Sequence, residues 1–190
     1  TLDGANALTI NTAGGTYFHN AVGQGTPLTS LTTDLDAGLV STDKVYIQGG
    51  RVETTEAQTY GEAVHMSLAT TLTASAVTFD KAVLGASSLQ VVGASNLNGI
   101  DVTTTGSQIY GGAVTLGANT TLTGVGVRFD DTVQGTTSAR ALTVQAGAGE
   151  VVDAIVDRPP GEEGHEGDGG KAAANPHRRA GRDRAPIGEC

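Results

Sequence analysis

The chain has 190 residues and a formal net charge of −9, with 11 Lys and Arg against 20 Asp and Glu. Only five of these cations precede residue 150, so the sequence lacks the clustered Lys and Arg that nucleic-acid binding needs. The one cysteine is Cys190, which excludes an internal disulfide and a cysteine-based metal site. No apolar run approaches the roughly 20 residues of a membrane-spanning helix.

The composition changes sharply near Gly149. Residues 150–190 hold four of the five prolines and no Thr, Ser, Tyr, Phe or Trp. We therefore divide the chain into residues 1–149, which can bury a core, and residues 150–190, a low-complexity and disordered tail. A binding role for the basic cluster of Arg178, Arg179, Arg182 and Arg184 is the alternative. The change also fits a frameshifted or truncated end.

The region 1–149 contains an internal repeat with a shift of 50 residues. Residues 54–88 and 104–138 are identical at 17 of 35 positions when aligned without a gap. The shared positions form blocks, among them Gln58, Tyr60 and Gly61, which return as Gln108, Tyr110 and Gly111. A fixed period of this kind is typical of stacked-repeat folds.

Period-two alternation runs through the second copy. Val114 and Leu116 have one parity, as do Val125, Val127 and Phe129, with Thr, Gly or Arg between them. This spacing fits strands and not a helix, and the many β-branched residues favour strands. A sandwich or a barrel also consists of short strands, but near-identical repeats favour a parallel β-helix. The fold class predicted is all-β, a β-solenoid.

The length of one turn is not determined by these patterns. A turn of about 20–25 residues would make the 50-residue unit two turns, and the region would then hold about six or seven turns. Under that hypothesis, equivalent residues of the two copies stack in ladders, with Tyr60 on Tyr110, Phe79 on Phe129 and Leu72 on Leu122.

Short strands are predicted at several other places. Val45, Tyr46 and Ile47 form one, and a Gly-rich turn leads into an apolar–polar–apolar triplet at residues 8–10, 89–91 and 142–144. The last strand is expected at residues 151–152 and 155–156. Because residues 1–11 look like the end of a repeat, we expect a fragment of a longer array, whose open ends favour end-to-end self-association.

Several polar residues are candidates for a functional site. The four histidines are far apart in sequence, and His65 is replaced by Thr115 in the second copy. Asp80 and Asp130 recur, but we interpret them as turn residues that satisfy their own backbone. Ser67 and Ser107 lack a nucleophile-elbow motif, and residues 124–126 lack a complete dinucleotide motif. Asn119 begins the sole glycosylation signal. We therefore expect no catalytic, cofactor-binding or metal-binding residues.

The repeats resemble those of the filamentous haemagglutinin-like large exoproteins of Gram-negative bacteria. The likeness covers residues 1–149 and is carried by residues 105–116 (TGSQIYGGAVTL), 119–123 (NTTLT), 28–34 (LTSLTTD) and 141–144 (ALTV). The resemblance implies a right-handed parallel β-helix that is secreted, or displayed on the outer membrane, by the two-partner or autotransporter route. It also implies an outer-membrane transporter, and partners on host or neighbouring cells.

The function expected from the resemblance is that of a non-catalytic rod segment of an adhesin, acting in adhesion, aggregation or biofilm formation. One alternative is a polysaccharide-acting β-helix enzyme, which would need acids gathered with Arg or Lys in a groove. The cations of this region are mostly far apart in sequence, at Lys44, Arg51, Lys81, Arg128 and Arg140. A second alternative is an intracellular structural or binding module.

Overall fold

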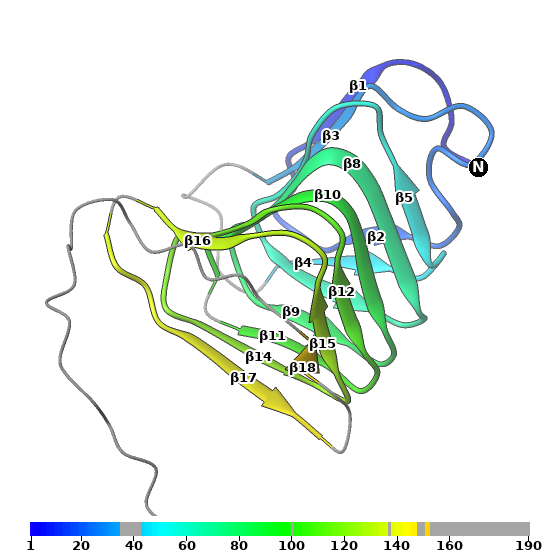
Figure 1. Ribbon diagram of the computed structural model, residues 1–190. Helices are drawn as coiled ribbons and strands as arrows, with labels where there is room; N and C mark the ends of the chain where they lie inside the picture. Colours follow the sequence, from blue (N-terminus) through cyan, green and yellow to red (C-terminus); the bar gives the residue numbers. More distant parts are fainter. Residues whose placement is uncertain (35–42, 100, 137, 148–150, 153–190) are drawn as a thin grey trace, which may run out of the picture. The chain divides into compact units, whose positions relative to one another are not determined.

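The structure is a computed structural model, and it describes residues 1–34, 43–99, 101–136, 138–147 and 151–152 (Figure 1). The predicted tail after residue 152, including the strand expected at residues 155–156, lies outside the described residues. Within the described part of the chain all regular structure is β-strand, and every strand pair is parallel.

The strands form two sheets. Sheet A contains β1 (Ala7–Ile10), β3 (Ser30–Thr33), β5 (Arg51–Glu53), β6 (Gln58–Tyr60), β8 (Thr70–Phe79), β10 (Leu89–Leu97), β12 (Gln108–Tyr110), β13 (Val114–Leu116), β15 (Val127–Phe129), β16 (Val133–Gly135) and β18 (Val151–Val152). Sheet B contains β2 (Thr16–Phe18), β4 (Lys44–Ile47), β7 (Ala63–Met66), β9 (Val83–Gly85), β11 (Asp101–Thr104), β14 (Thr120–Gly124) and β17 (Leu142–Ala146).

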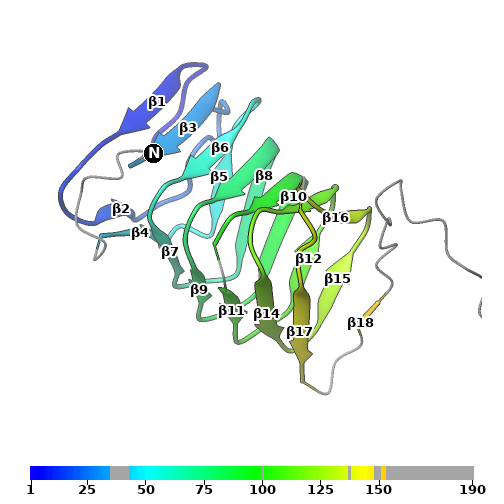
Figure 2. The same cartoon turned by 90° about the vertical axis from the view of Figure 1, so that its left-hand side faces the viewer.

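Each turn of the coil has three sides, because sheet A bends around a corner (Figure 1). Strands β8 and β10 cross that corner. Their second halves pair with β6 and β13, and their first halves pair with β5 and β12. We call the side that holds β1, β3, β6, β13 and β16 side A1, and the side that holds β5, β12, β15 and β18 side A2. Sheet B is the third side, and Figure 2 shows its strands in chain order.

The predicted β-solenoid is confirmed, with about seven turns. In the central turns the length of a turn is close to 19 residues, because Val64 pairs with Val83 and Val83 pairs with Val102. An earlier turn is longer, since Leu31 pairs with Gln58. The strands predicted at residues 45–47, 8–10, 89–91, 142–144 and 151–152 are present as β4, β1, the first half of β10, β17 and β18.

The 50-residue unit does not span two turns, as the assumed turn of about 20–25 residues would have required. Each turn has three sides, and β8 and β10 each occupy two of them. From β6 to β12 the chain therefore advances by eight sides, which is two and two-thirds turns. The two copies of the repeat therefore lie on different sides. Tyr60 is on side A1 and pairs with Phe79, whereas Tyr110 is on side A2 and pairs with Phe129.

The predicted ladders between the copies are consequently wrong as well. Leu72 lies on side A2 between Val52 and Val91, and Leu122 lies on sheet B beside Val102. The aromatic residues stack within each copy instead. The ring centroids of Tyr60 and Phe79 are 5.6 Å apart, and those of Tyr110 and Phe129 are 5.4 Å apart. The local packing is thus the same in both copies, but the second copy lies on a different side of the coil.

The interior of the coil is filled by the inward residues of all three sides. Inward and outward residues alternate along each strand, as the pleat requires. The core consists mainly of Val and Leu, with the two Tyr–Phe stacks as its largest members. Burying a Val or Leu side chain stabilises the fold by about 1.5–3 kcal/mol, so this continuous core is the main source of stability.

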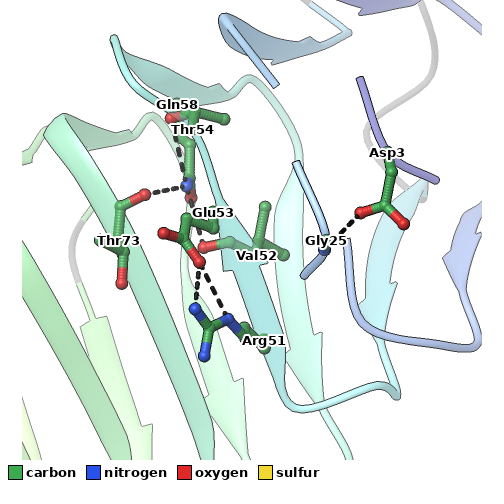
Figure 3. A network of polar contacts seen from close by, with 8 residues as sticks. All are labelled: Asp3, Gly25, Arg51, Val52, Glu53, Thr54, Gln58 and Thr73. Atoms are coloured by element: carbon green, nitrogen blue, oxygen red, sulfur yellow. Dashed lines mark hydrogen bonds and ion pairs between the residues drawn. The ribbon is translucent and has the colours of Figure 1, made fainter. Parts of the chain in front are cut away.

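A buried glutamine completes a corner in each copy of the repeat. The side-chain nitrogen of Gln58 donates to the carbonyls of Val52 and Thr73, at 3.1 and 3.0 Å, and approaches the Thr54 hydroxyl (Figure 3). Its side-chain oxygen accepts a hydrogen bond from the Tyr60 hydroxyl at 3.0 Å.

Gln108 makes the same set of bonds to Val102, Thr123, Thr104 and Tyr110. Each glutamine thus gives two backbone carbonyls a hydrogen bond and has partners for both polar atoms of its own buried amide group. This shared corner is a physical reason for the conserved spacing between the threonine, the glutamine and the tyrosine of both copies.

Candidate functional site

The outer face of sheet B carries a column of large side chains on consecutive turns. Tyr17, Tyr46, His65 and Leu84 occupy paired register positions on β2, β4, β7 and β9. Tyr17 is 53% exposed and Leu84 is 41% exposed. We call these four residues the aromatic column.

Local alternation places these side chains outside the coil. Each is the middle residue of a triplet whose outer members are buried or small, such as Thr16 and Phe18 around Tyr17, or Val45 and Ile47 around Tyr46. Since successive side chains on a strand point to opposite faces, two inward neighbours force the middle one outward.

The rings of the column stack along the axis of the coil. The ring centroids of Tyr17 and Tyr46 are 4.5 Å apart and their planes are within 3° of parallel. Tyr46 and His65 are 5.5 Å apart and tilted by 56°. His19 stacks on Tyr17 at 5.9 Å, and its Nδ1 forms a hydrogen bond with the side-chain oxygen of Gln48. The stack therefore holds both tyrosines in fixed positions at the surface.

An open hollow of about 580 Å³ lies beside Tyr46, His65 and Leu84 of the aromatic column. Its lining includes Tyr46, Gln48, His65, Ser67, Leu84 and Thr103. These groups combine an aromatic ring and an aliphatic side chain with amide, imidazole and hydroxyl groups. The hollow can thus offer both apolar contact and hydrogen bonds to a ligand.

The hollow is electrically neutral near pH 7. Partial burial, and then the charge of Lys44, lower the pKa of His65, so its imidazole is uncharged at that pH. No Asp, Glu, Lys or Arg is among the residues that line it. A neutral polar ligand therefore suits this hollow better than a charged one.

A second unusual feature is the corner between side A1 and sheet B. Asp34 follows β3, and Glu62 precedes β7 on the next turn; they are 7% and 6% exposed. Burial raises the pKa of Glu62 to about 7; the nearby Thr33 hydroxyl offsets part of this rise, and the charge of Asp34 adds to it. We call Thr33, Asp34 and Glu62 the acidic corner.

The recurring aspartates do not form a pair. Asp80 follows side A1 and accepts a hydrogen bond from the Asn98 side chain at 2.8 Å, whereas Asp130 follows side A2 and forms an ion pair with Arg128 at 2.8 Å. Both begin bends, as expected for turn residues, but they bind the side chains of Asn98 and Arg128 instead of their own backbone. The two carboxylates are apart because the two copies of the repeat lie on different sides of the coil.

The other candidates have separate surroundings. His65 lies on β7 of sheet B near Tyr46, and His19 follows β2 and stacks on Tyr17, while His165 and His177 lie outside the described residues. Ser67 lines the hollow, and the backbone nitrogen of Ser107 donates to Ser88. The side-chain oxygen of Asn119 accepts a hydrogen bond from the Ala141 backbone at 3.0 Å.

Sequence reasoning missed both features of this region. The aromatic column had a local signal, because Tyr17 and Tyr46 each stand at the outward position of a strand triplet. The acidic corner had none, since Asp34 and Glu62 are 28 residues apart and no motif joins them. Only the register of β3 and β6 brings them together.

Comparisons with known protein families, with characterised proteins and with solved structures find no match to this chain. Within the described ranges, no three or more His, Cys, Asp or Glu residues are grouped so that they could hold a metal ion. A search of the same residues for a long apolar helix that could cross a membrane also finds none.

Proposed function

We propose that residues 1–149 are a non-catalytic structural rod segment of a secreted or cell-surface adhesin of a Gram-negative bacterium. The observation that supports this most strongly is the stacking of turns in parallel register around a closed, buried core. A solenoid of this kind grows by adding turns, and it presents long outer sides to partners. The sequence resemblance agrees with that role.

The surface charges give less support to the polysaccharide-enzyme alternative. Such an enzyme needs carboxylates gathered in a groove. Here Arg51 pairs with Glu53 and Arg128 pairs with Asp130, both at exposed positions of side A2. Exposed pairs of this kind contribute at most about 1 kcal/mol, and they neutralise the carboxylates individually.

Sheet B is the side that we propose contacts a partner. Tyrosine is enriched at binding surfaces because it contributes a large apolar area with few rotatable bonds. The stack of Tyr17 on Tyr46 reduces that entropic cost further, since the rings are held before a ligand arrives. The neutral hollow beside them supplies hydrogen-bonding groups. The proposed partner is a neutral cell-surface molecule.

Adhesion by the full chain tests this function. Beads coated with the protein are expected to bind cells of the producing bacterium or host cells, and a Tyr17→Ser/Tyr46→Ser variant is expected to lose that binding. The control is Ile109→Ser, which removes an outward apolar side chain from side A2. Equal loss in both variants would contradict a binding face on sheet B.

Two further measurements test the wider proposal. Antibodies against the chain are expected to label intact cells of the producing bacterium, and retention of the protein inside those cells would favour the intracellular alternative. Incubation with acidic polysaccharides is expected to release no product. Release of shortened chains would overturn the non-catalytic assignment.

A further inference from the structure

The acidic corner places two carboxylates in the interior of the coil. Asp34 and Glu62 are the two acidic residues that are buried among the described residues. They belong to successive turns, since Thr33 pairs with Tyr60 two residues before Glu62. Burying an ionised carboxylate costs several kcal/mol unless it is paired or bound to a metal.

Close backbone packing fixes this arrangement. The backbone nitrogen of Gly61 donates to the Thr33 carbonyl at 2.9 Å. A Cβ atom at Gly61 would lie 1.9 Å from the carbonyl oxygen of Asp34, so only glycine fits here. Asp34 itself has a φ of +34°, and its Oδ1 accepts a hydrogen bond from the Thr12 backbone at 2.6 Å. One oxygen of Asp34 is therefore used to hold the corner.

Within the described part of the chain, the remaining oxygens have no hydrogen-bond partner. They are Oδ2 of Asp34, Oε1 and Oε2 of Glu62, and Oγ1 of Thr33. Thr33 is fully buried, and its hydroxyl lies near enough to Glu62 to affect the ionisation of that carboxyl. A buried neutral oxygen thus lies beside the Glu62 carboxyl group.

No cation of the described chain compensates these carboxylates. The two ion pairs among the described residues are Arg51–Glu53 and Arg128–Asp130, and both lie on side A2, away from the acidic corner. Lys44 pairs with Ala63, next to Glu62, but its charge acts on His65. The corner therefore has buried oxygen ligands and a negative charge that no ion pair of the described residues balances.

We propose that Asp34, Glu62 and Thr33 bind a calcium ion. All free donors are oxygens, which hard cations prefer, and the irregular arrangement suits calcium better than magnesium, which demands near-ideal octahedral geometry. Glu62 can bind through both oxygens, and water completes the shell. Two carboxylates give a modest affinity, in the range of about 0.1–1 mM that is typical of extracellular calcium modules.

The bound ion would join two turns of the coil. Asp34 belongs to the turn of β3 and β4, and Glu62 belongs to the turn of β6 and β7. An ion bound to both stabilises the folded chain over the unfolded one, because the site exists only when these turns are stacked. This site goes beyond the adhesin role and does not depend on it.

Calcium titration of the full chain tests the site. After treatment with a chelator and its removal, thermal unfolding is followed at about pH 7.5, above the pKa of about 7 of Glu62. Tm is expected to rise with calcium and to reach half of its change at about 0.1–1 mM. Titration calorimetry is expected to give one site per chain, and sodium chloride of equal ionic strength is expected to leave Tm unchanged.

Charge-removing variants identify the ligands. Glu62→Gln is expected to raise Tm in the absence of calcium. It is also expected to raise the calcium concentration at half-saturation by about tenfold or more. The higher Tm shows that the variant is folded, so a lost response to calcium then reports on binding. Asp130→Asn removes an exposed carboxylate on side A2 and is expected to respond like the parent chain.

Two outcomes would overturn the calcium site. The first is a parent chain whose Tm and heat do not respond to millimolar calcium, which would mean that the acidic corner holds only a proton. The second is a calcium response of equal midpoint in Glu62→Gln, which would mean that the ion binds elsewhere.

Discussion

The Tyr60 hydroxyl donates a hydrogen bond to the side-chain oxygen of Gln58, 3.0 Å away, and both side chains are fully buried. Gln108 and Tyr110 repeat this contact at the same distance on other sides of the coil. In both places the amide nitrogen of the glutamine satisfies two backbone carbonyls. The same buried network thus stabilises two corners that do not stack on each other.

Gln58→Leu is expected to lower the free energy of unfolding by about 1–3 kcal/mol, because it removes the hydrogen bonds to the Val52 and Thr73 carbonyls and leaves the buried Tyr60 hydroxyl without its acceptor. Urea denaturation measures the change. Tyr60→Phe alone is expected to cost about 1–2 kcal/mol, and the double variant less than the sum of both. Strict additivity would show that the two side chains are not coupled.

Phe129→Ala is expected to cost about 3–5 kcal/mol, because it removes a buried ring from the stack with Tyr110 and leaves a cavity. Asp130→Ala changes only the exposed partner of Arg128 and is expected to cost less than about 1 kcal/mol. The same denaturation series compares both variants. A harmless Phe129→Ala, together with an Asp130→Ala variant that stays folded but loses an activity, would overturn the structural-rod assignment.

Gly61→Ala and Gly111→Ala compare equivalent positions of the repeat. The Cβ atom added at Gly61 would meet the Asp34 carbonyl oxygen at 1.9 Å, whereas at Gly111 the nearest atom, the Val91 carbonyl oxygen, is 3.2 Å away. We expect Gly61→Ala to cost about 2–3 kcal/mol, as overpacking does, and Gly111→Ala less than about 1 kcal/mol. Thermal unfolding should separate them, and equal Tm values would argue against the tight contact.

The stability of the metal-free chain should depend on the ionisation of Glu62. Its pKa is raised from 4.5 to about 7 by burial and by Asp34, so the folded state holds this proton more tightly than the unfolded state does. The resulting contribution is fully present below about pH 4.5 and is lost as the pH rises through about 7.

The lost contribution amounts to up to about 3 kcal/mol. Other groups that face Glu62 are the Thr33 hydroxyl and Tyr60, whose own pKa is raised by burial. Denaturation in the presence of a chelator at several pH values measures the effect, with Glu62→Gln as the control. If the parent and Glu62→Gln show the same profile between about pH 4.5 and 7, the acidic corner does not titrate in this range.

The sequence by itself determined the class of fold and marked the residues that the two copies of the repeat share. Period-two alternation is a local property, because neighbouring side chains point to opposite faces of a strand whatever the strand pairs with. It therefore predicted the strands at residues 45–47 and 114–116 correctly. The repeat also marked Gln58 and Tyr60, with their equivalents Gln108 and Tyr110, as positions whose surroundings are kept.

The tertiary structure decided which residues become neighbours. Turn length depends on how the corners close, and about 19 residues in a turn place copies 50 residues apart on different sides. Asp80 and Asp130 are separated for that reason. Asp34 and Glu62 meet, and Tyr17 stacks on Tyr46, because adjacent turns pair in one register. Contacts between turns arise from this register, which no local sequence pattern contains.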